Sequence, residues 1–191
     1  KDCVVYDCVC ATDSIDNLSG KITISGDDMN TFGFLVGNNE GVVNKGKSGA
    51  YVAYKSDKTA IIIGGAVGIN SNTVKNVTVM FDLEDKGQAN CLGGVVGENL
   101  GTVKQCIYAG NIAKTGRSST GMTVGGIVAK NGSEDSKVSA VIKDCYLIGA
   151  GINVKGICNF TESTLEKNKI AQSSSTGGAC AINYEGAEIS N

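Results

Sequence analysis

The feature that most constrains the fold of this chain is a short segment that occurs five times. Each copy has a small residue in one column and an asparagine two residues later. The small residues are Gly37, Gly68, Gly97, Ala129 and Ala181, and the asparagines are Asn39, Asn70, Asn99, Asn131 and Asn183. The copies lie 31, 29, 32 and 52 residues apart. Such a period is typical of chains that stack one supersecondary unit on the next.

Short apolar and β-branched runs lie beside the repeated segments, as at residues 61–67, 92–96 and 103–108. Strands of this length cannot bury an apolar face alone, but they can when coils stack. The chain contains 27 glycines and no proline, so it turns often without proline. We therefore expect an all-β fold, a β-solenoid (β-helix) of about five to six imperfect coils of roughly 30 residues.

The expected organisation is one domain in four stretches. Residues 1–30 form an N-terminal capping coil that departs from the repeats, residues 31–150 hold four repeats, residues 151–176 are an insertion, and residues 177–191 are the last repeat or a C-terminal edge. Ser163 and Glu166 have the spacing of a capping box, which predicts a short helix in the insertion at residues 165–171.

Residues 93–106, GGVVGENLGTVKQC, resemble the GLUG motif, whose usual form is close to GGIVGxNxGxVxNC. Related copies at 33–46, 64–77, 125–145 and 177–190 extend the resemblance over roughly residues 31–190, with departures at Phe34, Ala129, Ala181 and the loop before Cys145. The resemblance implies β-helical coils of the kind found in large secreted or surface-attached proteins, mostly bacterial, including adhesin-like proteins and non-catalytic regions of some immunoglobulin A metalloproteases. It implies an architecture and no particular chemistry.

Cysteine is the residue type with the most open interpretation. The eight cysteines are Cys3, Cys8, Cys10, Cys91, Cys106, Cys145, Cys158 and Cys180. The chain has no histidine and no CxxC pair, so we expect no metal and no cofactor. Disulfides in an oxidising compartment and buried free thiols both fit. Cys106 and Cys145 hold equivalent places in adjacent coils, about 5 Å apart, where they could cross-link or pack as thiols.

Four sequons are compatible with glycosylation during export, and they begin at Asn17, Asn76, Asn131 and Asn159. The repeated asparagines are expected to stack as an internal ladder, with outward amides that bind sugar as the alternative. Six tyrosines could form an aromatic surface, although Tyr108 and Tyr146 fall near the cysteine column, where partial burial is expected.

Catalytic residues are not expected. Without histidine, a nucleophile lacks its usual base, and the acidic clusters at 27–28, 82–85 and 134–135 do not recur at one place in the repeat. The formal charge of -2 suggests no basic face, so we expect no nucleic acid partner. No apolar run reaches the length that spans a bilayer, so membrane insertion is not expected either.

The sequence thus predicts a non-catalytic extracellular or cell-surface module, structural or adhesive, that binds a protein or glycan on a surface. One alternative is a filament subunit that binds copies of itself through its solenoid ends, and another is a carbohydrate-active β-helix enzyme. The chain begins at Lys1 without an initiator methionine or a signal sequence, so we expect a mature product or an excerpt of a longer protein.

Overall fold

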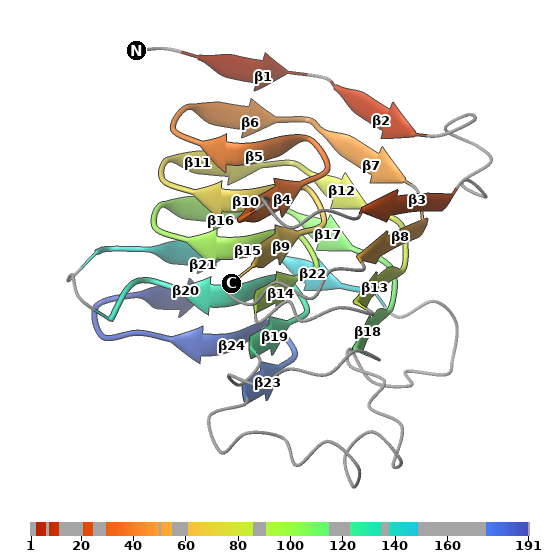
Figure 1. Ribbon diagram of the computed structural model, residues 1–191. Helices are drawn as coiled ribbons and strands as arrows, with labels where there is room; N and C mark the ends of the chain where they lie inside the picture. Colours follow the sequence, from red (N-terminus) through yellow and green to blue (C-terminus); the bar gives the residue numbers. More distant parts are fainter. Residues whose placement is uncertain are drawn as a thin grey trace, which may run out of the picture.

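The computed structural model describes residues 3–6, 8–11, 21–24, 30–49, 51–54, 61–85, 91–114, 123–134, 138–148 and 175–190. These residues form 25 parallel-paired β-strands and no helix, which confirms the predicted all-β solenoid (Figure 1). The helix expected at residues 165–171 lies outside the described ranges.

The strands belong to five parallel sheets, and each sheet takes one strand from successive coils. Sheet 1 contains β1 (Val4–Tyr6), β6 (Val42–Asn44), β11 (Thr73–Lys75), β16 (Thr102–Lys104), β21 (Val141–Lys143) and β25 (Glu188–Ser190). Sheet 2 contains β2 (Val9–Ala11), β7 (Lys47–Gly49), β12 (Thr78–Val79), β17 (Ile107–Tyr108) and β22 (Tyr146–Leu147). Sheet 3 contains β3 (Lys21–Ile24), β8 (Tyr51–Tyr54), β13 (Leu83–Asp85) and β18 (Ile112–Lys114).

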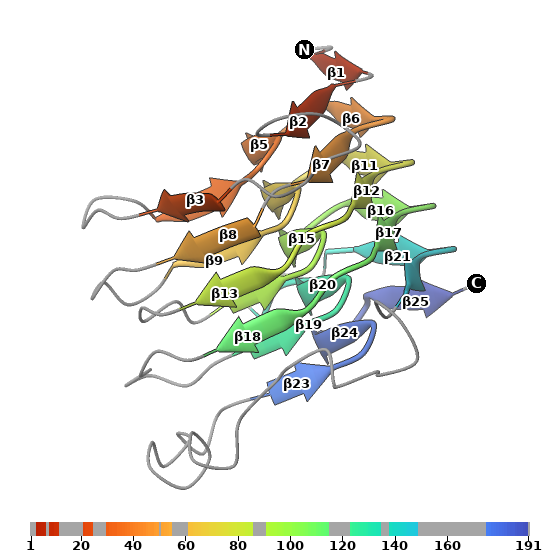
Figure 2. The ribbon, with the colours of Figure 1, turned by 90° about the vertical axis from the view of Figure 1, so that its right-hand side faces the viewer.

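The last two sheets carry the repeated segment. Sheet 4 contains β4 (Thr31–Gly33), β9 (Ile62–Gly64), β14 (Cys91–Gly93), β19 (Thr123–Gly125) and β23 (Ser175–Gly177). Sheet 5 contains β5 (Val36–Asn39), β10 (Val67–Asn70), β15 (Val96–Asn99), β20 (Val128–Asn131) and β24 (Cys180–Asn183). One coil therefore passes through sheets 1 to 5 in order, and β25 opens a sixth coil (Figure 2).

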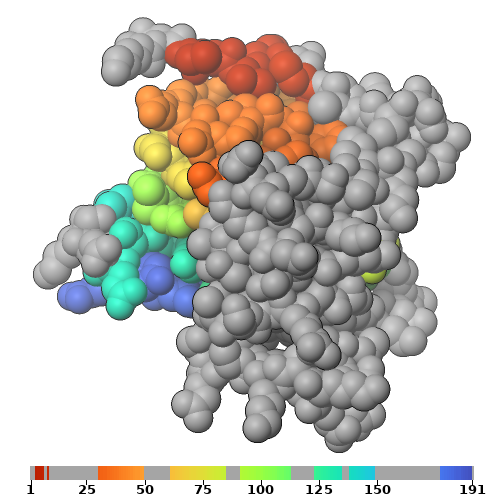
Figure 3. Space-filling model, viewed as in Figure 1, coloured from red at the N-terminus to blue at the C-terminus, as the bar shows by residue number. Residues whose placement is uncertain are grey.

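The register of these sheets follows the alignment of the repeats. Val74 pairs with Val103 and Val103 with Ile142, as the aligned second strands predict. The first coil keeps the same register, because β1, β2 and β3 pair with β6, β7 and β8. Residues 1–30 therefore contribute strands that continue the repeats, where the sequence suggested an irregular coil. The coils stack in chain order from red to blue (Figure 3).

The core runs along the inside of the stack. Val43, Val74, Val103 and Ile142 form one inner column of sheet 1, and none is more than 2% exposed. Burying a side chain of this size contributes about 1.5–3 kcal/mol. Tyr108 is also fully buried, and its hydroxyl donates to the carbonyl oxygen of Asn111 at 2.9 Å.

Two kinds of turn fix the shape of each coil. A Cβ placed on Gly64 or Gly93 would collide with the carbonyl oxygen three residues further on, so the turn from sheet 4 to sheet 5 requires glycine. The corner from sheet 1 to sheet 2 instead uses non-glycine residues in the left-handed region, with φ between 51° and 58°. These residues are Lys45, Asn76, Gln105 and Asp144. Each backbone N–H there donates to a carbonyl of the next coil, which offsets the cost of the conformation.

Candidate functional site

The five repeated asparagines lie in a single row at the turn that joins sheet 5 to sheet 1. From Asn39 the Nδ2 of each donates to the Oδ1 of the asparagine in the next coil, through Asn70, Asn99 and Asn131 to Asn183, at 2.7–2.8 Å. The first four are at most 5% exposed. This asparagine ladder therefore faces inward, and burial leaves no room for the alternative in which these four amides bind sugar.

Each amide in the ladder also holds the backbone of its own turn. The Nδ2 of Asn99 donates to the carbonyl oxygens of Gly101 and Val141 at 3.0 and 3.2 Å, while its Oδ1 accepts from the Gly101 N–H at 3.2 Å. Asparagine suits this place because it combines two donors with an acceptor on a short side chain. The amide of each repeated asparagine is thus used within the scaffold.

The ladder corrects one predicted glycosylation site. Asn131 is fully buried and its Nδ2 donates to Asn183 and to backbone carbonyls, so a glycan on this nitrogen is incompatible with the folded coil. Asn76 is exposed, and its Nδ2 donates to Asn44 at 2.9 Å. Asn17 and Asn159 lie outside the described residues.

The cysteines whose side chains the structure describes are free thiols, and these are Cys3, Cys8, Cys91, Cys106, Cys145 and Cys180. Among them the structure therefore contains none of the disulfides considered from the sequence. Nothing is described of the side chain of Cys10, and Cys158 lies outside the described residues.

Cys106 and Cys145 lie one above the other in adjacent coils, just before paired Ile107 and Tyr146. The interaction between the two thiols raises the pKa of Cys106 and lowers the pKa of Cys145. Cys106 is buried and Cys145 is half-buried. The thiolate, which is the reactive form, is thus favoured at the more accessible sulfur of the pair.

Two other thiols are held in their protonated form. Burial raises the pKa of Cys91 to about 12 and that of Cys180 to about 11. Cys91 is 1% exposed and its Sγ lies 3.4 Å from the carbonyl oxygen of Gly97. These cysteines act as small core residues.

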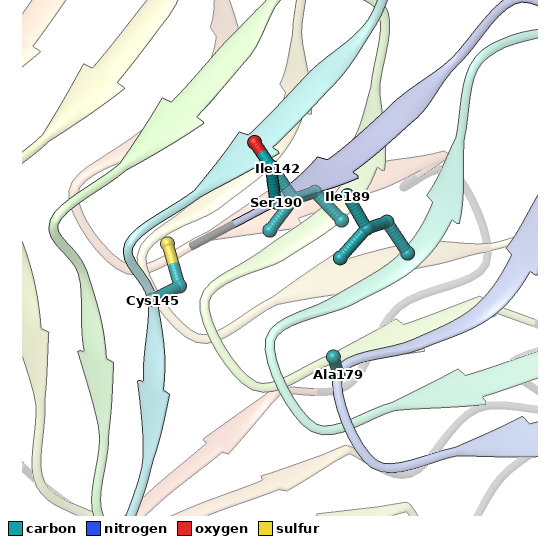
Figure 4. A pocket seen from close by; sticks show the side chains of 5 residues that line it. All are labelled: Ile142, Cys145, Ala179, Ile189 and Ser190. Carbon is teal, nitrogen blue, oxygen red and sulfur yellow. The ribbon is translucent and has the colours of Figure 1, made fainter.

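A pocket of about 230 Å³ opens beside Cys145 at the lower end of the stack (Figure 4). Its other lining residues are Ile142, Ala179, Ile189 and Ser190. Ile189 continues the buried inner column of sheet 1 but is 45% exposed, because no strand lies beneath β25 among the described residues. The pocket is therefore an uncovered end of the core, lined by few polar groups.

The outer surface of sheet 1 carries a feature that the sequence reasoning missed. Lys75, Lys104 and Lys143 pair in register on three successive strands. Lys45 lies at the adjoining corner and Lys47 on sheet 2. We call these five residues the lysine face. The expectation of no basic face was wrong because net charge does not report where charges gather. The signal was present in the aligned segments, which place the three lysines in one column.

Asp82 has a structural role. The carboxylate of Asp82 accepts from the backbone and side-chain nitrogens of Asn111 at 2.8 and 3.1 Å, which fixes a turn of the next coil. Within the described ranges, no three histidine, cysteine, aspartate or glutamate side chains are grouped so as to hold a metal ion. The same part of the chain has no helix long and apolar enough to cross a membrane.

These features define the chain as a parallel β-solenoid whose coils are joined by an internal asparagine ladder. Comparison with protein-family models, curated proteins and solved structures finds no match. The resemblance to GLUG repeats therefore stays a prediction that depends on the motif residues alone.

Proposed function

We propose that this chain is a non-catalytic structural or adhesive module of GLUG-like repeats that acts outside the cell or at its surface. Its partners are a protein or a glycan on a facing surface. The stack supplies length and rigidity, and its outer faces supply the contacts.

The observation that carries this proposal is the division between the inside and the outside of the coils. The inner positions repeat from coil to coil, as in the asparagine ladder and the inner column of sheet 1. Outer positions vary more, as in the column of sheet 5 that reads Asn38, Ile69, Glu98, Lys130 and Ile182. A constant scaffold with variable outer faces is the usual design of repeat proteins that bind along their length.

The test is to immobilise the full chain and probe it with arrays of glycans and host-surface proteins. We expect saturable binding of at least one ligand, which is recovered chemically unchanged after prolonged incubation. Release of a shortened or eliminated product would instead favour the carbohydrate-active enzyme. Absence of any ligand, together with end-to-end assemblies, would favour the filament subunit.

The filament alternative has one observation in its favour, the uncovered lower end. Ile189 and the pocket beside it would be buried by another coil. However, among the described residues sheet 1 extends to a sixth coil while sheets 2, 4 and 5 end at the fifth. A second copy seated on those three sheets would bring its own β1 to the level of β25. One of the two strands must therefore leave sheet 1 before such copies can join.

Electron microscopy and light scattering of the full chain over a range of concentrations test this alternative. End-to-end fibres that disappear in an Ile189→Lys variant would support it, because the lysine would place a charge in the buried junction. A monomer at all concentrations would exclude the filament and leave the lateral faces as the sites of binding.

A further inference from the structure

We propose that the lysine face binds a linear anionic polysaccharide that carries carboxylate or sulfate groups along its length. This inference rests on the adhesive function proposed above and names the ligand class for one face of the stack.

Three of the lysines form a straight row along the stack. Lys75, Lys104 and Lys143 lie on neighbouring parallel strands, in direct register. Adjacent strands are about 4.8 Å apart, so the three ammonium groups start from evenly spaced points along the solenoid axis. A straight row of cations at a fixed repeat matches a polymer that carries an anion on successive units.

The charge of the lysine face is complementary to that of an anionic ligand. The outward positions of sheet 1, its corner and sheet 2 are all described in the second, third and fourth coils, and they include no carboxylate. Among the described residues, Glu40 lies in the turn before this face, Asp144 follows Lys143 at the corner of the fifth coil, and Glu188 lies on the last strand. The face is therefore positive in the second to fourth coils although the whole chain has a formal charge of -2.

The row of three lysines does not stabilise the fold. Like charges directly opposite each other on paired strands are destabilising. The outer column of sheet 5 has the stabilising arrangement, with Glu98 paired to Lys130. An anionic ligand would remove the repulsion between the three lysines, whereas the fold alone would be better served by alternating charges.

The neighbouring side chains favour a polysaccharide over a nucleic acid. Thr73, Thr102, Asn76 and Gln105 lie beside the lysines and offer hydroxyl and amide groups that can hydrogen-bond to sugar hydroxyls. Single-stranded nucleic acids are usually bound by aromatic side chains on which successive bases stack. The exposed tyrosines of this side of the stack, Tyr6 and Tyr146, lie at the two ends of the lysine row and not between the lysines.

The experiment measures binding of the full chain to heparin and to polygalacturonate by calorimetry at several salt concentrations. Neutral dextran and a single-stranded oligonucleotide of matched charge are the comparison ligands. The protein is produced without N-glycans because Asn76 is exposed within this face. The variant is Lys75→Gln/Lys104→Gln/Lys143→Gln, and the control is Lys130→Gln on the outer face of sheet 5. Circular dichroism verifies that both variants are folded.

We expect at least one of the two polyanions to bind, with an affinity that falls as salt rises. The triple variant should lose about tenfold or more in affinity, and its log–log salt dependence should be shallower by about two to three units. Lys130→Gln should bind as the natural chain does. Equal losses in both variants, equal binding of dextran, or a preference for the oligonucleotide would overturn the inference.

The outcome separates this inference from the broader function. A chain that binds a neutral glycan or a protein on the arrays, but neither polyanion, would keep the adhesive function and refute the role of the lysine face. A chain that binds nothing on the arrays and neither polyanion would refute both.

Discussion

At the scale of single residues, the asparagine ladder explains why asparagine recurs at the same turn of five successive coils. Each buried amide satisfies its neighbours above and below as well as the backbone of its own turn. A buried polar group left without a partner costs about 1–3 kcal/mol. Substitutions in the middle of the ladder should therefore cost more than substitutions at its end.

We predict that Asn99→Ala lowers the free energy of unfolding by about 3 kcal/mol, because the buried polar groups that hydrogen-bond to this side chain are left without partners. Asn183→Ala, at the exposed end, should cost less than about 1 kcal/mol. Equilibrium denaturation with urea measures both. Equal losses would contradict a ladder that stabilises through burial.

The stacked thiols give a prediction that depends on pH. The neighbouring Cys106 thiol lowers the pKa of Cys145, so at neutral pH Cys145 has more thiolate than an ordinary cysteine in the same place. Cys106→Val removes this thiol, and Val77 occupies the same column in the coil above. The pKa of Cys145 should then rise and its alkylation should slow.

Mass spectrometry of alkylation rates between about pH 6 and pH 9 measures this change. Cys91, with a pKa raised to about 12, should remain unmodified in the folded chain and serves as the internal control. A rate for Cys145 that does not change in the variant would show that the Cys106 thiol does not control its reactivity.

At the scale of elements, the turn between sheets 4 and 5 should be the least tolerant part of the coil. Gly93→Ala places a methyl group against the carbonyl oxygen of Val96 and should lower the free energy of unfolding by about 1–3 kcal/mol. Gly37→Ala in the first coil meets open space and should leave stability unchanged or raise it slightly. Thermal and chemical denaturation of the pair test this, and a harmless Gly93→Ala would contradict the tight turn.

The sequence predicted the repeating elements because the repeat itself encodes their register. The aligned Val74, Val103 and Ile142 became neighbours on paired strands, and the repeated asparagines became one row. The corner at Lys45, Asn76, Gln105 and Asp144 could not be predicted in this way, because tertiary hydrogen bonds hold non-glycine residues in the left-handed region. The lysine face was missed because net charge was read for the chain as a whole.

At the scale of the whole molecule, the chain is a stack of interchangeable coils that differ mainly on their outer faces. Each coil contacts only the coils beside it, so stability should be nearly a sum of coil and interface contributions. Removing one whole period should therefore shorten the stack without changing its type. Removing part of a period should shift every later strand out of register with its partner in the neighbouring coil.

The most direct test is deletion of residues 71–99, which takes out one complete period of 29 residues and joins Asn70 to Leu100. Circular dichroism with urea denaturation should show a folded β protein that unfolds cooperatively at a lower denaturant concentration. Deletion of residues 71–84, about half a coil, should abolish folding. If both deletions unfold the chain, or both leave it equally stable, the stack of interchangeable coils is contradicted.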